Sequence, residues 1–215
     1  MRLVLLGPPA GGKGTQAKEL SKHYNIPSIS TGAMIRHEIA GETGIGKKAK
    51  AFIDVGQLVP DELVIKLLLK RLSEDDCKNG YILDGYPRNV EQAKIADEKG
   101  IAVDKVLLFE VSDDEVIHRI TGRRECKECN SVYHVVSNPP KTEGVCDNCG
   151  AALVARKDDT RETVEKRLAV YHEITEPLKE FYAKKGILIK VLGKEKVEDT
   201  TAEMFAALGE EYGNN

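Results

Sequence analysis

Short apolar runs alternate along this chain with longer stretches whose apolar residues recur at helical spacing. The run from Arg2 to Leu6 has no polar alternation, which is typical of a parallel strand buried on both faces. Predicted strands cover residues 2–6, 26–30, 80–85, 106–110 and 186–192. Predicted helices cover residues 16–24, 33–40, 46–55, 62–72, 89–99, 113–121, 160–185 and 198–208. The alternation predicts an α/β fold, with a five-stranded parallel sheet and helices on both faces.

Three residues mark boundaries within the predicted helices. Asp61 is a good N-cap for the helix over 62–72, because its carboxylate can accept a hydrogen bond from the first turn. Gly100 closes the helix over 89–99. Pro177 predicts a kink within the long stretch 160–185.

The loop after the first strand runs from Gly7 to Thr15, reads G-P-P-A-G-G-K-G-T and leads into a helix. Strand, glycine-rich loop, lysine and helix form the context in which G-x-x-x-x-G-K binds phosphate. Glycines let backbone N–H groups turn toward an anion, and the helix N-terminus and Lys13 add positive charge. Gly14 carries no hydroxyl, which first appears at Thr15, so we expect phosphates and water to hold the Mg²⁺. A glycine-rich turn that binds nothing is the alternative.

A carboxylate ends the third predicted strand. Ligands of parallel sheets bind outside the C-terminal strand ends, where Asp84 and the glycine-rich loop both lie. Asp84 is therefore a candidate for holding Mg²⁺ or its water shell, the alternative being a turn residue that caps the next helix. Arg88 follows the rigid Pro87 and is a candidate bidentate clamp on phosphate.

Arginines recur at strand ends, helix starts and the borders of residues 122–159. They are Arg36, Arg88, Arg119, Arg123, Arg124, Arg156, Arg161 and Arg167. Phosphoryl transfer develops negative charge on phosphate oxygens, and cations supply most of the catalysis. A solvated helix face is the alternative for any single arginine, and it is our interpretation of Arg124 and Arg161.

Residues 122–159 lose the helical pattern and become rich in Cys, Gly, Pro and Asn. The pairs Cys126-x-x-Cys129 and Cys146-x-x-Cys149 are separated by sixteen residues, which is typical of a four-thiolate Zn²⁺ site. Four protein ligands leave no position for water, so the predicted zinc is structural and not catalytic. Disulfides or free thiols are the alternative.

The composition limits which cellular compartment and which kinds of partner are expected. The chain has 215 residues, enough for one core and small insertions, and a net charge of −3 from 32 Lys+Arg and 35 Asp+Glu. The overall basic excess of a nucleic-acid binder is absent. No apolar run reaches the length of a membrane span, and the first strand is too short for a signal peptide. We expect a cytoplasmic protein with neither a membrane nor a nucleic-acid partner, in which a disulfide framework is disfavoured.

Two further side chains near these features have plain interpretations. Cys77 stands alone and is expected to be a semi-buried thiol. His134, close to the cysteine pairs, is expected to be packed or hydrogen-bonded and not to be a fifth metal ligand.

Together these features resemble the adenylate kinase family, in the long form whose lid carries a zinc knuckle. The likeness covers essentially the whole chain. The matching segments are G-P-P-A-G-G-K-G-T at 7–15, T-G-A-M-I-R at 31–36, G-Q-L-V-P-D-E-L at 56–63, L-D-G-Y-P-R at 83–88, Gln92, G-R-R at 122–124, V-Y-H at 132–134, R-K-D-D at 156–159 and Lys166-Arg167. The resemblance implies the Mg²⁺-dependent reaction ATP + AMP ⇌ 2 ADP, carried out by a monomer with a structural Zn²⁺.

The resemblance also implies three parts. The core P-loop domain would comprise residues 1–29, 60–121 and 160–215. Residues 30–59 would form a nucleoside monophosphate-binding domain that closes over AMP. Residues 122–159 would form a zinc-binding lid that closes over ATP.

The site residues that the resemblance implies fall into four groups. ATP would contact Ala10, Gly11, Gly12, Lys13, Gly14, Thr15, Arg119, Arg123, Val132, Tyr133 and Glu195. AMP would contact Thr31, Arg36, Gln57, Leu58, Val59, Gly85, Tyr86, Pro87, Arg88, Gln92, Arg156 and Arg167. The transferred phosphoryl group would be surrounded by Lys13, Arg88, Arg123, Arg156 and Arg167, with Asp84 at the metal and with Asp158 and Asp159 anchoring the lid arginines. The metal ligands would be Cys126, Cys129, Cys146 and Cys149.

Two positions depart from the family pattern. Ala10 stands where glycine is usual, and Ala33 stands where a carboxylate is common. If the loop needs a positive φ at position 10, alanine strains it by about 1 kcal/mol. We expect instead that the neighbouring Gly11 takes the permissive conformation and leaves the phosphate site intact.

Two other functions are alternatives to this hypothesis. A kinase for UMP or CMP could use the same scaffold. A zinc-ribbon nucleic-acid module fused to an ATPase switch would need a basic face with interleaved aromatic side chains. Residues 122–159 offer Tyr133 and no Trp, which argues against that module.

Overall fold

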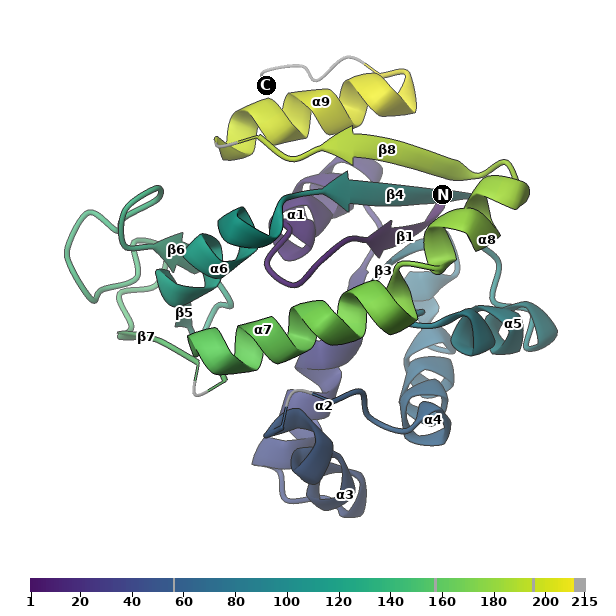
Figure 1. Ribbon diagram of the computed structural model, residues 1–215, viewed down its shortest axis with the longest axis horizontal. Helices are drawn as coiled ribbons and strands as arrows, with labels where there is room; N and C mark the ends of the chain where they lie inside the picture. Colours follow the sequence, from purple (N-terminus) through teal and green to yellow (C-terminus); the bar gives the residue numbers. More distant parts are fainter. Residues whose placement is uncertain (56, 157, 195, 211–215) are drawn as a thin grey trace.

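Five parallel strands form the central sheet of the computed structural model, which describes residues 1–55, 57–156, 158–194 and 196–210. Their order across the sheet is β2-β3-β1-β4-β8, so the first strand of the chain lies in the middle (Figure 1). The strands are β1 (Arg2–Leu6), β2 (Ser28–Ser30), β3 (Tyr81–Asp84), β4 (Lys105–Glu110) and β8 (Leu188–Leu192). The predicted five-stranded parallel sheet is confirmed.

Helices cover both faces of this sheet. The helices α1 (Lys13–Tyr24) and α9 (Val197–Leu208) lie on one face, and α4 (Asp61–Leu72), α5 (Val90–Glu98) and α8 (Leu178–Lys184) lie on the other. Along β1, Leu3 and Leu5 pack with the residues of α1 and α9, whereas Val4 and Leu6 pack with those of α4, α5 and α8. All four side chains are buried, which explains why the run lacks polar alternation.

A pair of helices, α2 (Thr31–Ala40) and α3 (Gly44–Ile53), stands beside the sheet and connects to α4. The two helices approach closely, because a Cβ atom at Gly46 would lie 2.0 Å from the carbonyl oxygen of Glu38. Ile35 and Ala49 are buried between them and join the main core. Glycine at position 46 is therefore a packing requirement of this pair.

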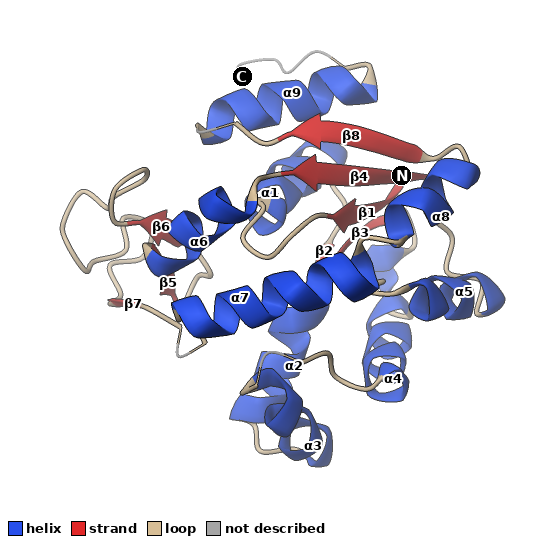
Figure 2. Cartoon of the chain, in the orientation of Figure 1, coloured by secondary structure: helices blue, strands red, loops and turns tan. Residues whose placement is uncertain are grey.

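A second insertion separates α6 (Asp113–Thr121) from α7 (Arg161–Val170). It carries a small antiparallel sheet in the order β6-β5-β7, built from β5 (Arg123–Cys126), β6 (Val132–His134) and β7 (Leu153–Val154). Figure 2 shows this sheet projecting from one end of the molecule. The two supporting helices pack on each other through the apolar cluster Val116, Ile120, Val164 and Leu168.

Two helix boundaries can be compared with those predicted from the sequence. Asp61 does not cap α4, which contradicts our prediction: the helix begins at Asp61 itself, and the preceding Pro60 makes no side-chain cap. The Asp61 carboxylate instead accepts a hydrogen bond from Gln92 Nε2 at 2.6 Å. The predicted kink near Pro177 is confirmed, since a π-helical turn over Tyr171–Thr175 separates α7 from α8. A short 3-10 turn, Asp75–Cys77, follows α4.

In the described part of the chain, every helix is too short or too polar to cross a membrane.

Candidate active site and metal centre

The loop between β1 and α1 is held in a compact conformation by its own backbone. Gly12, the residue before α1, has a φ of +86°, and Gly7 lies so close to β4 that a Cβ atom would be 2.7 Å from the Phe109 carbonyl oxygen. Gly11 N donates to Pro8 O at 3.1 Å. The loop therefore curls in front of the α1 N-terminus, where free N–H groups and the helix dipole favour an anion.

Ala10 itself has a positive φ of +51°, whereas Gly11 is not among the residues with positive φ. Our expectation that Gly11 takes over the permissive conformation is therefore wrong. The reason lies in the turn: Pro8 to Gly11 are closed by a hydrogen bond, with Pro9 at the second position. A type II turn of this kind requires a positive φ at its third position, whichever residue is there. The Ala10 side chain packs against the α6–α7 cluster, which partly offsets the backbone strain.

Lys13 folds back over this loop. Its Nζ donates to the carbonyl oxygens of Gly7 and Pro8, at 2.8 and 2.6 Å. Burial lowers the pKa of Lys13 from 10.5 to about 8, an effect that Asp84 opposes and that Arg88 and Arg123 reinforce. The structure thus brings together four charged residues that the sequence predicted for one site.

Asp84 ends β3 beside the loop. Its Oδ2 lies 3.7 Å from the position that a Cβ atom of Gly14 would occupy, which is ordinary contact distance, so the carboxylate lies directly beside the first turn of α1. Carboxylate oxygens and water are the ligands that Mg²⁺ prefers. Asp84 therefore fits a metal that is held mainly by phosphates and water.

Arg88 is fixed by a network of buried polar groups. Its Nε donates to Gly85 O at 2.8 Å, and its backbone N donates to Gln92 Oε1 at 2.7 Å. Gln92 is 2% exposed, and its amide also donates to Asp61. Burial lowers the pKa of Arg88, Asp84 opposes this, and Arg167 reinforces it. Gln92 thus positions the arginine, and the contribution of Asp61 is one that sequence reasoning missed.

The rest of the predicted AMP side lies on α2 and on the loop after β3. Thr31 is buried and donates to Gly85 O at 2.7 Å. The buried Tyr86, joined to Pro87 by a cis peptide bond, donates to Gln92 O at 2.9 Å. The residues between α3 and α4 are exposed at Gln57, half-buried at Leu58 and buried at Val59.

Arg36 on α2 faces charges from the second insertion. Burial lowers the pKa of Arg36 to about 10, Arg156 reinforces the shift, and Glu125 and Asp158 oppose it. The two insertions therefore lie close enough for their charges to act on one another.

Three arginines around the insertion are each paired with a carboxylate. Arg123 makes a bidentate pair with Asp159, at 2.8 and 2.5 Å, and Arg156 Nε donates to Glu125 at 2.5 Å. Arg167 pairs with Asp158.

Of these carboxylates, Asp159 holds an arginine of the insertion as the resemblance implied, whereas the partner of Asp158 lies on α7. Burial raises the pKa of Asp158, but Arg167 outweighs it and the net pKa is lowered. No local sequence pattern points to Glu125, whose partner lies 31 positions away.

Arg119 on α6 reaches the phosphate loop. Its Nε donates to Glu115 at 2.7 Å and its Nη2 to Lys194 O at 3.0 Å. Its Nη1 lies 4.0 Å from the position that a Cβ atom of Gly12 would occupy. The predicted ATP contact at Glu195 lies outside the described residues.

The four cysteines of the insertion form one cluster. Their Sγ atoms lie within 4.8 Å of one another, with 3.4 Å between Cys126 and Cys149 and 3.5 Å between Cys129 and Cys146. A tetrahedral Zn²⁺ site with bonds of about 2.3 Å separates its sulfur atoms by about 3.8 Å. The donor set therefore fits a structural zinc ion, with all four ligands supplied by the protein.

Both cysteine pairs have the same backbone turn. The N–H of Asn130 donates to Cys126 O at 3.0 Å, and that of Gly150 donates to Cys146 O at 2.8 Å. Both residues have a positive φ, +56° and +75°. His134 is buried and hydrogen-bonded to the backbone, as predicted.

A family model described as adenylate kinase matches residues 5–187. The adenylate kinase of Caldicellulosiruptor bescii is 52% identical over 213 residues, which are 97% of this chain and 99% of that protein. The adenylate kinase of Caldicellulosiruptor saccharolyticus is 51% identical over 215 residues, 98% of this chain and 100% of that protein. That of Agathobacter rectalis is 48% identical over 214 residues, with 98% and 100% covered.

The chain belongs to the adenylate kinase family. It is therefore a phosphotransferase, and the resemblance drawn from its motifs is confirmed. Membership of the adenylate kinase family also favours adenine nucleotides over the UMP or CMP alternative.

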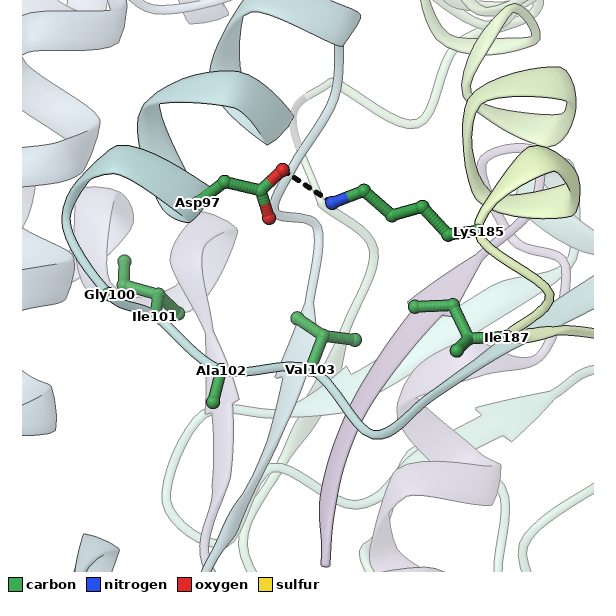
Figure 3. Close-up of a pocket in the computed structure, with 7 residues that line it drawn as sticks. All are labelled: Asp97, Gly100, Ile101, Ala102, Val103, Lys185 and Ile187. Atoms are coloured by element: carbon green, nitrogen blue, oxygen red, sulfur yellow. Dashed lines mark hydrogen bonds and ion pairs between the residues drawn. The ribbon is translucent and has the colours of Figure 1, made fainter.

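A hollow of about 500 Å³ lies away from the phosphate loop and the charged residues around it. Figure 3 shows its lining: Asp97, Gly100, Ile101, Ala102, Val103, Lys185 and Ile187. The ion pair between Asp97 and Lys185 crosses it. These residues precede β4 and β8, at the edge of the sheet opposite the phosphate loop. Because ligands of parallel sheets bind at the C-terminal strand ends, the hollow is not the nucleotide site.

Proposed function

We propose that this member of the adenylate kinase family catalyses the Mg²⁺-dependent reaction ATP + AMP ⇌ 2 ADP. The observation that carries the proposal is the convergence of Lys13, Asp84, Arg88 and Arg123 at the C-terminal edge of the sheet, where their charges act on one another. Such a cluster of cations around a phosphate loop suits a reaction whose transition state gathers negative charge.

The donor ATP binds along the phosphate loop. Residues 10–15 surround the phosphates with backbone N–H groups, and Lys13 supplies a charge that is already inside the loop. Arg119 and Arg123 flank the loop from α6 and β5, and Val132 offers an apolar surface that is 41% exposed. Glu195 completes the predicted ATP set.

The acceptor AMP binds between α2 and the loop after β3. Arg36 and Arg88 are the cations available to its phosphate, and Gln92 fixes the Arg88 backbone. The remaining members of this set are Thr31, Gln57, Leu58, Val59, Gly85, Tyr86, Pro87, Arg156 and Arg167.

Transfer requires no covalent enzyme intermediate. An oxygen of the AMP phosphate attacks the γ-phosphorus of ATP in line, and the bond from that phosphorus to the β-phosphate oxygen breaks, so both products are ADP. Lys13, Arg88, Arg123, Arg156 and Arg167 stabilise the charge on the transferred group. Asp158 and Asp159 orient two of these arginines through their ion pairs.

When bound, Mg²⁺ would neutralise phosphate charge and help to orient the phosphate chain of ATP. Asp84 is the residue that would hold it, through its water shell.

Closure of two insertions excludes water from the reacting phosphates, which prevents hydrolysis of ATP. We assign residues 30–59 to the monophosphate-binding domain, residues 122–159 to the lid, and the remainder to the core. The mutual influence of Arg36 and Arg156 supports this division, because one residue lies in each insertion.

We further propose that the lid holds one structural Zn²⁺ on Cys126, Cys129, Cys146 and Cys149. We also predict that the protein is a monomer, that it lies in the cytoplasm, and that its small-molecule partners are ATP, AMP and ADP.

The test is a coupled assay of the purified protein with ATP, Mg²⁺ and each nucleoside monophosphate in turn. We expect ADP formation that depends on AMP and is far weaker with UMP or CMP. Equal ATP hydrolysis with and without AMP, and no ADP derived from AMP, would contradict the proposed reaction.

A further inference from the structure

Tyr133 lies on β6, directly after the first cysteine pair, yet its side chain reaches the second pair. The phenol oxygen is 3.6 Å from Cys146 Sγ and 2.9 Å from the backbone N of Asp147. The residue is 9% exposed and shares a buried cluster with Cys126 and Cys146. One side chain therefore joins the two halves of the four-cysteine cluster.

The available protons determine the direction of the contact with Cys146. The Asp147 N–H donates to the Tyr133 hydroxyl, so the hydroxyl already acts as an acceptor there. A phenol has one proton to give, and a metal-bound thiolate has none. With metal in the site, Tyr133 is the donor and Cys146 Sγ is the acceptor.

Strand alternation explains why Tyr133 serves this purpose while its neighbour does not. Residues two apart on an extended segment point to the same side. Ser131 Oγ lies 3.1 Å from Cys129 Sγ, so Ser131 and Tyr133 both face the sulfur atoms. Val132 between them is 41% exposed. Each cysteine pair thus has one hydroxyl neighbour from the same side of this segment.

We propose that Tyr133 is a positioning residue of the metal centre. Its hydroxyl holds Cys146 in the orientation needed for metal binding and slows the loss of the metal. A hydrogen bond to a metal-bound ligand fixes the direction of that ligand and tunes its electron density. The inference rests on the zinc-bound lid proposed above.

The contacts of the Tyr133 hydroxyl limit how this residue could bind ATP. The resemblance implies that Tyr133 contacts ATP, but its hydroxyl is engaged with Cys146 and Asp147. An ATP contact at this position would therefore use the backbone or the ring edge, while the exposed Val132 offers a free side chain.

The test compares zinc release from full-length, zinc-loaded proteins into an excess of a chromogenic chelator, without nucleotide. Tyr133→Phe keeps the ring and removes only the hydroxyl. We expect release about tenfold faster than from the unsubstituted protein, as is usual when an outer-sphere partner is lost. The matched control is Tyr81→Phe, which removes a hydroxyl bonded to Ala102 O at 2.6 Å in the core and should leave release unchanged.

A second measurement uses Co²⁺ in place of zinc. Loss of a hydrogen bond raises the energy of the sulfur lone pairs, so the sulfur-to-cobalt charge-transfer band of Tyr133→Phe should move to longer wavelength. Release within twofold of the control, together with an unchanged band, would overturn the role of Tyr133. If the unsubstituted protein takes up neither Zn²⁺ nor Co²⁺, the metal site itself fails, whatever the outcome for phosphoryl transfer.

Discussion

Ala10 carries backbone strain that glycine would not. Its φ of +51° is imposed by the turn closed between Pro8 and Gly11. For alanine this conformation costs about 1–2 kcal/mol, whereas glycine adds about 0.4–1 kcal/mol of unfolded-state entropy. We expect Ala10→Gly to raise the free energy of unfolding by at most about 1 kcal/mol in denaturant titrations.

The matched control is Ala17→Gly, a buried helical position on α1 where the same change should lower that free energy by about 1 kcal/mol or more. Because the turn itself is unchanged, we expect the Michaelis constant for ATP to change less than threefold, about 0.6 kcal/mol. A tenfold gain in ATP affinity would show that the strained conformation hinders binding.

Lys13 is a second residue where function opposes stability. Burial lowers its pKa to about 8, so its charge is disfavoured in the folded chain at neutral pH. Between pH 8 and 10.5 the unfolded chain holds more protons at this residue, and the free energy of unfolding therefore rises with pH. Lys13→Met should abolish that rise, stabilise the protein at pH 7 and reduce phosphoryl transfer by about 100-fold or more.

Denaturant titrations across this pH range, paired with the coupled assay, measure both effects. Lys22→Met, at an exposed position near the end of the same helix, serves as the control. An Lys13→Met variant that is less stable than the unsubstituted protein at pH 7 would contradict the reasoning.

At the residue scale, sequence reasoning found the side chains that motifs define and missed those that only the fold selects. Lys13, Asp84 and Arg88 follow from local context, because a strand end and a glycine-rich loop fix their surroundings. Asp61 and Glu125 pair with residues 31 positions away, and no local pattern encodes such a pairing. The positive φ expected at Gly11 lies at Ala10, because the turn closed between Pro8 and Gly11 requires it at the third position.

At the scale of elements, the junction between α6 and the lid depends on one glycine. A Cβ atom at Gly122 would lie 2.1 Å from Nε2 of His134, whose buried ring is bonded to the His118 carbonyl oxygen. We expect Gly122→Ala to lower the free energy of unfolding by about 1–3 kcal/mol, because the ring must be displaced. Gly44→Ala is the control, since a Cβ atom there meets nothing within 4 Å. If the two variants are equally stable in denaturant titrations, the His134 ring can move aside at no cost, which would contradict this prediction.

A histidine links α6 to the π-helical turn. His172 lies 2.9 Å from Glu176 and 3.0 Å from Asp113, and hydrogen bonds to these carboxylates raise its pKa. Lys179 also contacts Glu176, at 2.5 Å. Since the folded-state pKa is raised, the stabilisation is complete below pH 6.5, the unfolded value, and is lost as pH rises through the folded value.

We therefore expect His172→Gln to lower stability at pH 6 and to flatten its decline between pH 6 and 8. The side chain is 46% exposed, so solvent screening keeps the effect small. His37→Gln on α2 is the control, and thermal unfolding across this pH range is the measurement. A pH profile identical to that of the unsubstituted protein would exclude the link.

The hydrophobic pattern predicts most strands and helices of the core because each of them buries a regular face. All five strands of the central sheet are predicted, and α6 is predicted with its observed ends. Boundaries elsewhere moved by a few residues: β2 begins at Ser28, after Pro27, which has no N–H for a ladder. The π-helical turn before Pro177 could not be foreseen beyond a kink, since helical periodicity does not report an extra residue in one turn.

At the scale of the whole molecule, the lid and the core have different sources of stability. The only apolar side chains that the described lid residues bury are those of Cys126, Tyr133 and Cys146, whereas the core buries apolar side chains on both faces of the sheet. Structural zinc contributes apparent binding energies of about 10–16 kcal/mol in isolated peptides. Loss of the metal should therefore melt the lid first and leave the core folded.

The test is the double variant Cys146→Ser with Cys149→Ser. We expect metal content to fall from one equivalent to near zero, a clear drop in the first thermal transition, and residual phosphoryl transfer at low temperature. Cys77→Ser, which removes a buried thiol outside the lid, is the control. Full activity and unchanged melting after metal loss would refute a structural role for the site.

The central position of β1 has a consequence for how the protein is made. The ribosome synthesises β1 before its two neighbours in the sheet, which begin at Tyr81 and Lys105. At about 5–20 residues per second, roughly 5–20 s separate the synthesis of β1 from that of β4. Until β3 has been made, neither edge of this apolar strand has a strand partner, and the edge that pairs with β4 stays open for the whole interval. The phosphate loop lies against Phe109 of β4, so it can reach its final shape only after about half of the 215 residues have been synthesised, and its folding therefore depends on a strand that is made much later.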